Sequence, residues 1–166
     1  MKKIFIIAMF GFITAGCQEK RVRITKGDQD DLVLVETEDD EMNAAIANAK
    51  STFIKDFHTA LLSKNPNFSN FAIKQRFELP DGAGEHIWFG EIEFKKGKYL
   101  GVIQNEPYEN IGVKLGDSVQ ININNLSDWM YYDKNIVKGA YTVKVLRKTM
   151  SEEELKHMDS EGLIYE

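Results

Sequence analysis

Hydrophobic residues recur at steps of three and four positions in the segment that begins at Met42. The apolar positions of this segment are Met42, Ile46, Ala49, Phe53, Phe57 and Leu61. This spacing predicts a helix with one apolar face, because an α-helix completes a turn about every 3.6 residues. Asp39 or Asp40 is suited to cap its start, and the segment Asn65-Pro66-Asn67 ends it. One helix cannot bury such an aromatic face alone, so we expect it to pack on a sheet.

After this helix, apolar and polar residues alternate, which is typical of half-buried strands. The alternation predicts strands at Phe71–Glu78, His86–Phe94, Tyr99–Gln104, Ser118–Ile123 and Tyr141–Arg147, with a short further segment at Trp129–Tyr132. The spacing around Gly97 predicts a hairpin. In the tail, Ser151–Met158 is a charged helix candidate, because Ser151 and Glu154 fit a capping box.

Strands that follow one another through short turns, after a helix, are typical of an α+β domain. We therefore expect one N-terminal amphipathic helix packed on an antiparallel sheet of about five strands. A sheet of this size is small enough to curl into a partly open barrel.

The composition divides the chain into four parts. We expect a signal segment at 1–17, a charged tether at 18–41, the α+β domain at 42–150 and a charged, partly helical tail at 151–166. Eight acidic residues and no basic residue lie between Asp28 and Glu41. This block favours an extended, solvated spacer. A short strand at Leu32–Val35 and a site for a basic partner stay open as alternatives.

The chain starts with two lysines, an apolar run over Ile4–Gly16 and then Cys17. The run is well short of the roughly 20 residues that span a bilayer as a helix, and the pattern is typical of a bacterial secretion signal. The segment Thr14-Ala15-Gly16-Cys17 resembles the lipobox of bacterial lipoproteins, which usually has leucine in place of Thr14. The resemblance implies that Cys17 carries acyl chains such as palmitate and anchors the chain in a membrane. An ordinary cleavable signal is the closest alternative.

The compartment follows from the same resemblance. In enterobacterial lipoproteins a residue other than Asp after the acylated cysteine implies the outer membrane, and this chain has Gln18. We therefore expect a lipid-anchored protein of the bacterial cell envelope, on the outer membrane and facing the periplasm.

Charge and cysteine content narrow the range of functions. The chain has 21 basic and 26 acidic side chains, and loss of the signal with its two lysines would leave a net charge of −7. This balance disfavours nucleic acid, which proteins bind mainly through Lys and Arg on phosphates. Cys17 is the only cysteine, so thiol catalysis and cysteine-bound zinc are excluded from the domain. Phosphate-binding glycine patterns do not occur in the sequence, and we expect neither a cofactor nor a metal.

Several motifs, in a fixed order, resemble one known family. They are Glu85-His86-Ile87-Trp88, the segment 101–107, Gly116-Asp117, the segment 127–131 and Gly139-Ala140-Tyr141-Thr142. Together with the preceding helix they resemble the DUF2314 family, bacterial domains of unknown function that include the YegJ-like proteins. The resemblance covers roughly residues 42–146. It implies a known domain and brings no assigned reaction or cofactor.

Two clusters carry side chains that are capable of chemistry. Glu85 and His86 beside Trp88 would suit a general base or a metal ligand, although adjacent residues of a strand point to opposite faces. Packing of His86 at the start of a strand is the simpler interpretation. The second cluster, around Asp128, lacks the Gly-x-Ser-x-Gly pattern of a nucleophile elbow. Asp128 is therefore expected to accept backbone N–H bonds in a turn, and Trp129 to fill the core.

An aromatic groove is a further possibility. Trp88, Trp129, Tyr131, Tyr132 and Tyr141 would provide its walls for a peptide or a glycan, since Tyr and Trp supply much contact area at little cost in rotamer entropy. The candidate ligand or partner surface thus consists of Glu85, His86, Trp88, Asp128, Trp129 and Tyr132.

The leading functional hypothesis is a membrane-anchored, non-catalytic interaction domain of the envelope. A sharper form is an inhibitor- or immunity-like protein that uses its acidic surface against a basic enzyme. The alternative is a small envelope hydrolase or glycan-modifying enzyme that uses Glu85, His86 or Asp128.

Overall fold

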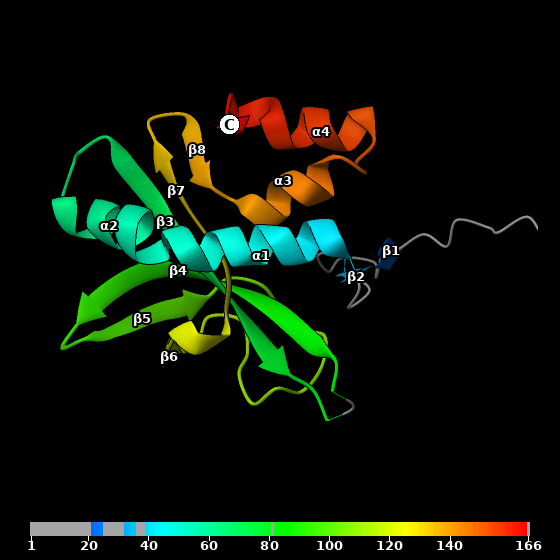
Figure 1. Ribbon diagram of the computed structural model, residues 1–166, viewed down its shortest axis with the longest axis horizontal. Coiled ribbons are helices and arrows are strands. Elements are labelled where there is room, and N and C mark those ends of the chain that lie inside the picture. The colour runs from blue at the N-terminus through cyan, green and yellow to red at the C-terminus, as the bar shows by residue number, and fades with distance from the viewer. Residues whose placement is uncertain (1–20, 25–31, 36–38, 81, 166) are drawn as a thin grey trace, which may run out of the picture.

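The structure, a computed structural model, describes residues 21–24, 32–35, 39–80 and 82–165 (Figure 1). The predicted signal segment and Cys17 lie outside the described residues. A 7-stranded sheet forms the body of the fold, in the order β6-β5-β4-β3-β7-β8-β9. Its strands are β3 (Phe68–Glu78), β4 (Gly84–Lys95), β5 (Lys98–Ile103), β6 (Ser118–Gln120), β7 (Leu126–Asp133), β8 (Ile136–Gly139) and β9 (Ile164–Tyr165).

The prediction of an α+β fold with an antiparallel sheet is confirmed, apart from one parallel pair, β8 with β9. The sheet is larger than the five strands expected, because β8 and β9 span only 4 and 2 residues and are too short to show alternation. It is also not a barrel: β6 and β9 are its two edges, and the sheet stays open.

The strand predicted at Tyr141–Arg147 is wrong, since these residues form helix α3. β-Branched residues such as Thr142 and Val145 favour strands by propensity. In the folded chain their spacing of three matters more, because both side chains are buried on one face of the helix. The strand predicted to reach Ile123 ends earlier, at Gln120, and Ile123–Asn125 forms the 3₁₀ helix η2.

The predicted amphipathic helix is confirmed over its length, but it contains a wider turn. It consists of α1 (Asp40–Thr52), the π-helix η1 (Phe53–His58) and α2 (Thr59–Ser63). Asp39 caps its start by accepting the backbone N–H of Met42 at 3.0 Å. Four residues of its buried face pack on the sheet, namely Ala49, Phe53, Phe57 and Ala60. The first two, Met42 and Ala45, pack against Val145 of α3 (Tyr141–Arg147). Figure 1 shows this helix lying across the sheet, with β7 and β8 on one side of it and β5 and β6 on the other.

The amphipathic helix is not the first element in the described part of the chain. Strands β1 (Arg21–Ile24) and β2 (Leu32–Val35) precede it and form a separate antiparallel pair. The predicted tether at 18–41 thus contains two short strands that pair with each other. The short strand left open at Leu32–Val35 is the correct alternative, because its four residues are apolar and the acidic residues lie on either side of it.

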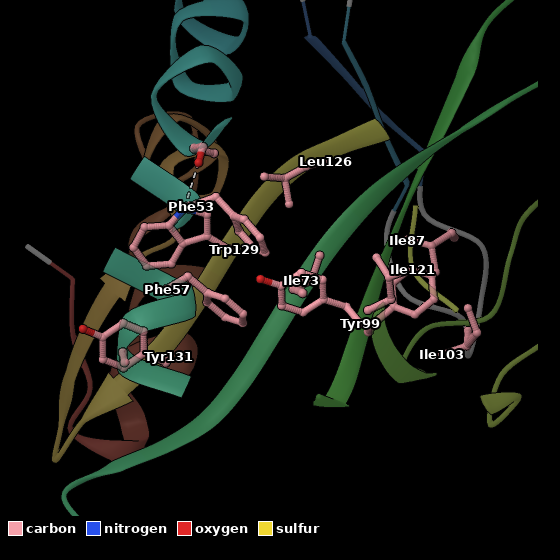
Figure 2. Packing of buried hydrophobic residues seen from close by; sticks show 13 residues of the cluster. Phe53, Phe57, Ile73, Ile87, Tyr99, Ile103, Ile121, Leu126, Trp129 and Tyr131 are labelled. Atoms are coloured by element: carbon pink, nitrogen blue, oxygen red, sulfur yellow. Dashed lines mark hydrogen bonds between the residues drawn. The ribbon is translucent and has the colours of Figure 1, made fainter. Parts of the chain in front are cut away.

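The core lies between the helix and the sheet, and its centre is aromatic (Figure 2). Phe53 and Phe57 stack with their ring centroids 5.1 Å apart, and Phe57 lies 5.7 Å from Trp129. The indole N–H of Trp129 donates to the carbonyl oxygen of Ala49 at 2.9 Å, so the buried polar atom of this large ring is satisfied. Trp129 fills the core as predicted.

The tail continues into the fold. Helix α4 (Glu152–Met158) begins with the predicted capping box, in which Ser151 and Glu154 exchange hydrogen bonds. It is followed by the short 3₁₀ helix η3 (Asp159–Glu161), and β9 then joins the main sheet. Among the described residues, no helix is both long enough and apolar enough to cross a membrane.

Candidate functional site

A groove of about 410 Å³ lies between the helix segments η1 and α2 and the strands β7 and β8. Aromatic side chains from three parts of the chain form its floor: Phe68, Trp129, Tyr131 and Tyr141. Charged side chains stand at its rim, and they are Lys55, Asp56 and Lys138. The groove is open to solvent, so it offers a contact surface with an apolar floor and a few polar groups at its edge.

The aromatic floor is rigid because its rings hold one another. Trp129 and Tyr131 are two residues apart on β7 and stand nearly parallel, with an angle of 11° between their planes. Phe68 packs on Tyr131 with the ring centroids 5.0 Å apart, and Tyr141 meets Trp129 edge-on at 5.7 Å. Trp129 is almost fully buried, so a ligand would touch the edges of this cluster rather than the face of the indole.

The wide turn of η1 forms one wall of the groove. It keeps Phe53 and Phe57 buried while Lys55 and Asp56 line the groove. π-Helical turns are rare and occur frequently at functional sites, because they rotate the following residues relative to a regular helix. The last part of α1, which precedes η1, is fixed to β7 because the indole N–H of Trp129 donates to the carbonyl oxygen of Ala49.

Gly139 lies in the opposite wall and is the first of two consecutive left-handed residues. Gly139 has φ +76°, and a Cβ atom there would lie 2.3 Å from the carbonyl oxygen of Trp129. Ala140 follows with φ 52°, a conformation that costs a residue with a side chain about 1 kcal/mol or more. These residues turn the chain from β8 into α3 and so place Tyr141 beside Trp129.

The phenol of Tyr131 lies among the charges of the groove. Burial raises the pKa of Tyr131, the positive charge of Lys138 lowers it, and the negative charges of Asp133 and Asp56 raise it further. The net change is upward, so Tyr131 stays a neutral hydroxyl at physiological pH and is able to donate a hydrogen bond.

Asp128 does accept backbone N–H bonds, as predicted, but on strand β7 rather than in a turn. Its Oδ1 accepts the N–H of Trp129 at 2.8 Å and that of Tyr141 at 3.1 Å. Its Oδ2 accepts the N–H of Thr142 at 2.8 Å and the Thr142 hydroxyl at 2.5 Å. The carboxylate is fully buried and holds the first turn of α3 against β7.

Glu85 and His86 do not act together. Glu85 is buried and accepts the N–H groups of Tyr108 and Glu109 at 2.5 and 3.2 Å, which fixes the loop between β5 and β6. His86 lies on the other face of β4, opposite Arg76, and keeps more than a third of its surface exposed. Loss of hydration and the charges of Lys74 and Arg76 lower the pKa of His86 to about 4.

The remaining predicted residues are divided between the faces of the sheet. Trp88 shares the face of His86, and its ring lies 4.6 Å from the ammonium nitrogen of Lys74. Tyr132 follows Tyr131 on β7 and therefore lies on the opposite face from the groove. Of the predicted aromatic groove, Trp129, Tyr131 and Tyr141 are brought together, whereas Trp88 and Tyr132 are not.

Sequence reasoning missed Lys55, Asp56, Phe68 and Lys138. No local signal marks them, since they come from η1, β3 and β8 and meet only in the folded chain. In the part of the chain that the structure describes, no group of three or more His, Cys, Asp or Glu side chains is arranged to hold a metal ion.

Comparison with known proteins gives a family without an assigned activity. The family model described as "Uncharacterized protein conserved in bacteria (DUF2314)" matches residues 39–165. The chain is 30% identical to the uncharacterized protein YegJ of Escherichia coli K12 over 155 residues, which cover 93% of this chain and 94% of YegJ. It is 31% identical to a putative ankyrin repeat protein of Neisseria meningitidis serogroup B over 132 residues, 76% of this chain but only 52% of that longer protein. No solved structure matches this chain.

Proposed function

The chain belongs to the DUF2314 family of uncharacterized bacterial proteins, and we propose that it acts as a non-catalytic binding domain whose contact site is the groove. One observation carries this proposal. The two carboxylates best placed for catalysis by sequence, Glu85 and Asp128, are both buried and accept hydrogen bonds that hold the fold together. The groove, by contrast, brings the charged side chains of Lys55, Asp56 and Lys138 together beside the edge of the aromatic core.

The composition of the groove supports recognition of a protein partner. Binding energy at protein interfaces is concentrated in Trp, Tyr and Arg side chains near the centre, with polar groups around them. Tyr141 and the exposed edge of the largely buried Tyr131 provide such a centre here, and Lys55, Asp56 and Lys138 provide a rim of both charges. A rigid floor adds to affinity, because little side-chain entropy is lost on binding.

The place of action that we propose is the periplasmic side of the outer membrane, with acyl chains on Cys17 as the anchor. The support is the lipobox-like segment that ends at Cys17 and the residue Gln18 after it. The net charge of −7 that remains after loss of the signal segment would favour encounter with a basic partner, as in an inhibitor- or immunity-like protein.

The experiment that tests the groove uses a photoreactive amino acid in living cells. Lys55 is replaced by p-benzoylphenylalanine, and Lys50, five residues earlier on the exposed side of the same helix, is the matched control. We expect a discrete protein adduct from position 55 and none from position 50, with a yield that falls when Lys138→Glu alters the rim. Adducts of equal yield from both positions, or none from position 55, would contradict the proposal.

The alternative, a small envelope hydrolase or glycan-modifying enzyme, has less support. It needs Glu85, His86 or Asp128 as reacting groups. Glu85 points to the other face of β4 from His86, and the carboxylates of Glu85 and Asp128 are both occupied by hydrogen bonds within the fold. It would regain support if His86→Ala abolished the biological effect of the protein while its folding and its adduct at position 55 stayed unchanged.

A further inference from the structure

Three polar side chains form a buried network beside the groove. The ammonium group of Lys74 donates to the hydroxyl oxygen of Thr142 at 2.8 Å, and that hydroxyl donates to Oδ2 of Asp128 at 2.5 Å. Lys74 and Asp128 are register partners on β3 and β7, and Thr142 lies in the first turn of α3. All three side chains are buried, so their interactions are little weakened by solvent.

One carboxylate oxygen of Asp128 holds the backbone of both residues whose rings meet edge-on in the groove, Trp129 and Tyr141. Oδ1 of Asp128 accepts the backbone N–H of Trp129 and that of Tyr141. The chain between these residues returns through Gly139 and Ala140, and the N–H of Ala140 donates to the carbonyl oxygen of Trp129 at 2.8 Å. The distance between the Trp129 and Tyr141 rings therefore depends on where the Asp128 carboxylate lies.

Lys74 and Asp128, as register partners, both point to the face of the sheet opposite to the groove, and only the hydrogen bonds from Asp128 to the backbone of Trp129 and Tyr141 reach the groove side. Side chains alternate along β3, so Lys74 points away from the face that Ile73 gives to the core. On that face the Lys74 ammonium lies over the ring of Trp88, its register partner on β4. A cation held over an indole face is attracted by the ring, and this attraction strengthens as water is excluded.

We propose that the Lys74–Thr142–Asp128 network controls the geometry of the groove and couples it to the Trp88 face of the sheet. Asp128 is the positioning residue, Thr142 is the link and Lys74 is the sensor on the far face. Displacement of the Lys74 ammonium from Trp88 shifts Thr142, moves the Asp128 carboxylate and changes the spacing of Trp129 and Tyr141. The importance of this coupling for partner binding rests on the function proposed above.

The chain offers a direct readout, because its two tryptophans lie at the two ends of the network. Labelling with 5-fluorotryptophan gives two ¹⁹F resonances, which the variants Trp88→Phe and Trp129→Phe assign. The variants under test are Lys74→Met and Thr142→Val, in the ligand-free chain. Thr142→Ser retains the hydroxyl, and Arg76→Met removes a cation from the same face without entering the network.

We expect Lys74→Met and Thr142→Val to shift the Trp129 resonance, and Thr142→Ser and Arg76→Met to leave it in place. An unchanged Trp129 resonance in folded Thr142→Val would overturn the proposal. If Lys74→Met does not fold, Thr142→Val decides alone, because it exchanges one hydroxyl for a methyl group of similar size. Since no ligand is present, the outcome does not depend on whether the groove binds a partner, which the crosslinking at position 55 tests separately.

Discussion

At the scale of single residues, the groove depends on a backbone position that only glycine fits. Gly139 is left-handed, and it also lies against Trp129, where a Cβ atom would come within 2.4 Å of the indole ring. Two separate costs are therefore expected for a larger residue, namely backbone strain and a clash with a side chain that the core does not allow to move.

We predict that Gly139→Ala lowers the free energy of unfolding by about 2–4 kcal/mol, the sum of strain and overpacking. Gly97→Ala is the matched control, because Gly97 has φ +78° with no atom within 4 Å of the added Cβ. It should lose only about 1 kcal/mol from strain. Urea unfolding followed by tryptophan fluorescence measures both, and equal losses would show that the contact with Trp129 is unimportant.

His86 makes stability depend on pH on the acidic side. Its pKa is about 4 in the folded chain against an ordinary value of 6.5, first because of lost hydration and then because of Lys74 and Arg76. Between these values the unfolded chain binds a proton that the folded chain does not, so the free energy of unfolding falls as the pH falls from about 6.5 to about 4. We predict that His86→Gln flattens this part of the pH profile, which urea unfolding at a series of pH values measures. Because His86 is partly exposed, the test is whether the free energy of unfolding still falls between pH 6.5 and about 4 in the variant, and not how large the fall is.

At the scale of elements, the sequence predicts long periodic segments well and short ones poorly. The apolar spacing of the helix and the alternation in β3, β4 and β5 extend over enough residues to be recognised. Helix α3 spans only 7 residues, which is too short for a clear periodic pattern. Its first turn is held by Asp128 on strand β7, which accepts the N–H groups of Tyr141 and Thr142. The wide turn η1 is likewise invisible in the pattern, because it keeps Phe53 and Phe57 at a spacing that an ordinary α-helix also accepts.

The loop between β5 and β6 is held in its middle part by the side chain of Glu85. Its backbone N–H groups at Tyr108 and Glu109 both donate to Glu85. We predict that Glu85→Ala speeds hydrogen exchange at these two amides by about tenfold or more, since each bond to a charged acceptor is worth about 1.5–3 kcal/mol. Exchange in the core strands should change little. A chain that retained slow exchange at both amides would show that other contacts hold the loop.

At the scale of the whole molecule, the candidate site is a product of the topology. Its groove joins η1, α2, β3, β7, β8 and the start of α3, which meet because β3 pairs with β7 across the centre of the sheet. Residue type alone predicts Trp129, Tyr131 and Tyr141 as parts of the groove, but it groups them with Trp88 and Tyr132. These last two side chains point to the other face, since neighbours along a strand alternate. Residue type thus predicted part of the site, and only the fold determined which aromatic residues meet.

The attachment of the whole molecule to the envelope depends, in our proposal, on Cys17 alone. Acyl chains on this sulfur would each contribute about 0.8 kcal/mol per buried methylene, and several chains together make attachment durable. We predict that Cys17→Ser moves the protein from the membrane to the soluble fraction of an enterobacterial host and removes the mass of the acyl chains from its N-terminus. Gln18→Asp is the matched control: it keeps the acylated cysteine and should leave the protein on membranes, but shift it from the outer to the inner membrane. Retention of the Cys17→Ser chain on the outer membrane would mean that a contact of the folded domain, rather than lipid, holds it there, and the groove variants would then be the first place to look for that contact.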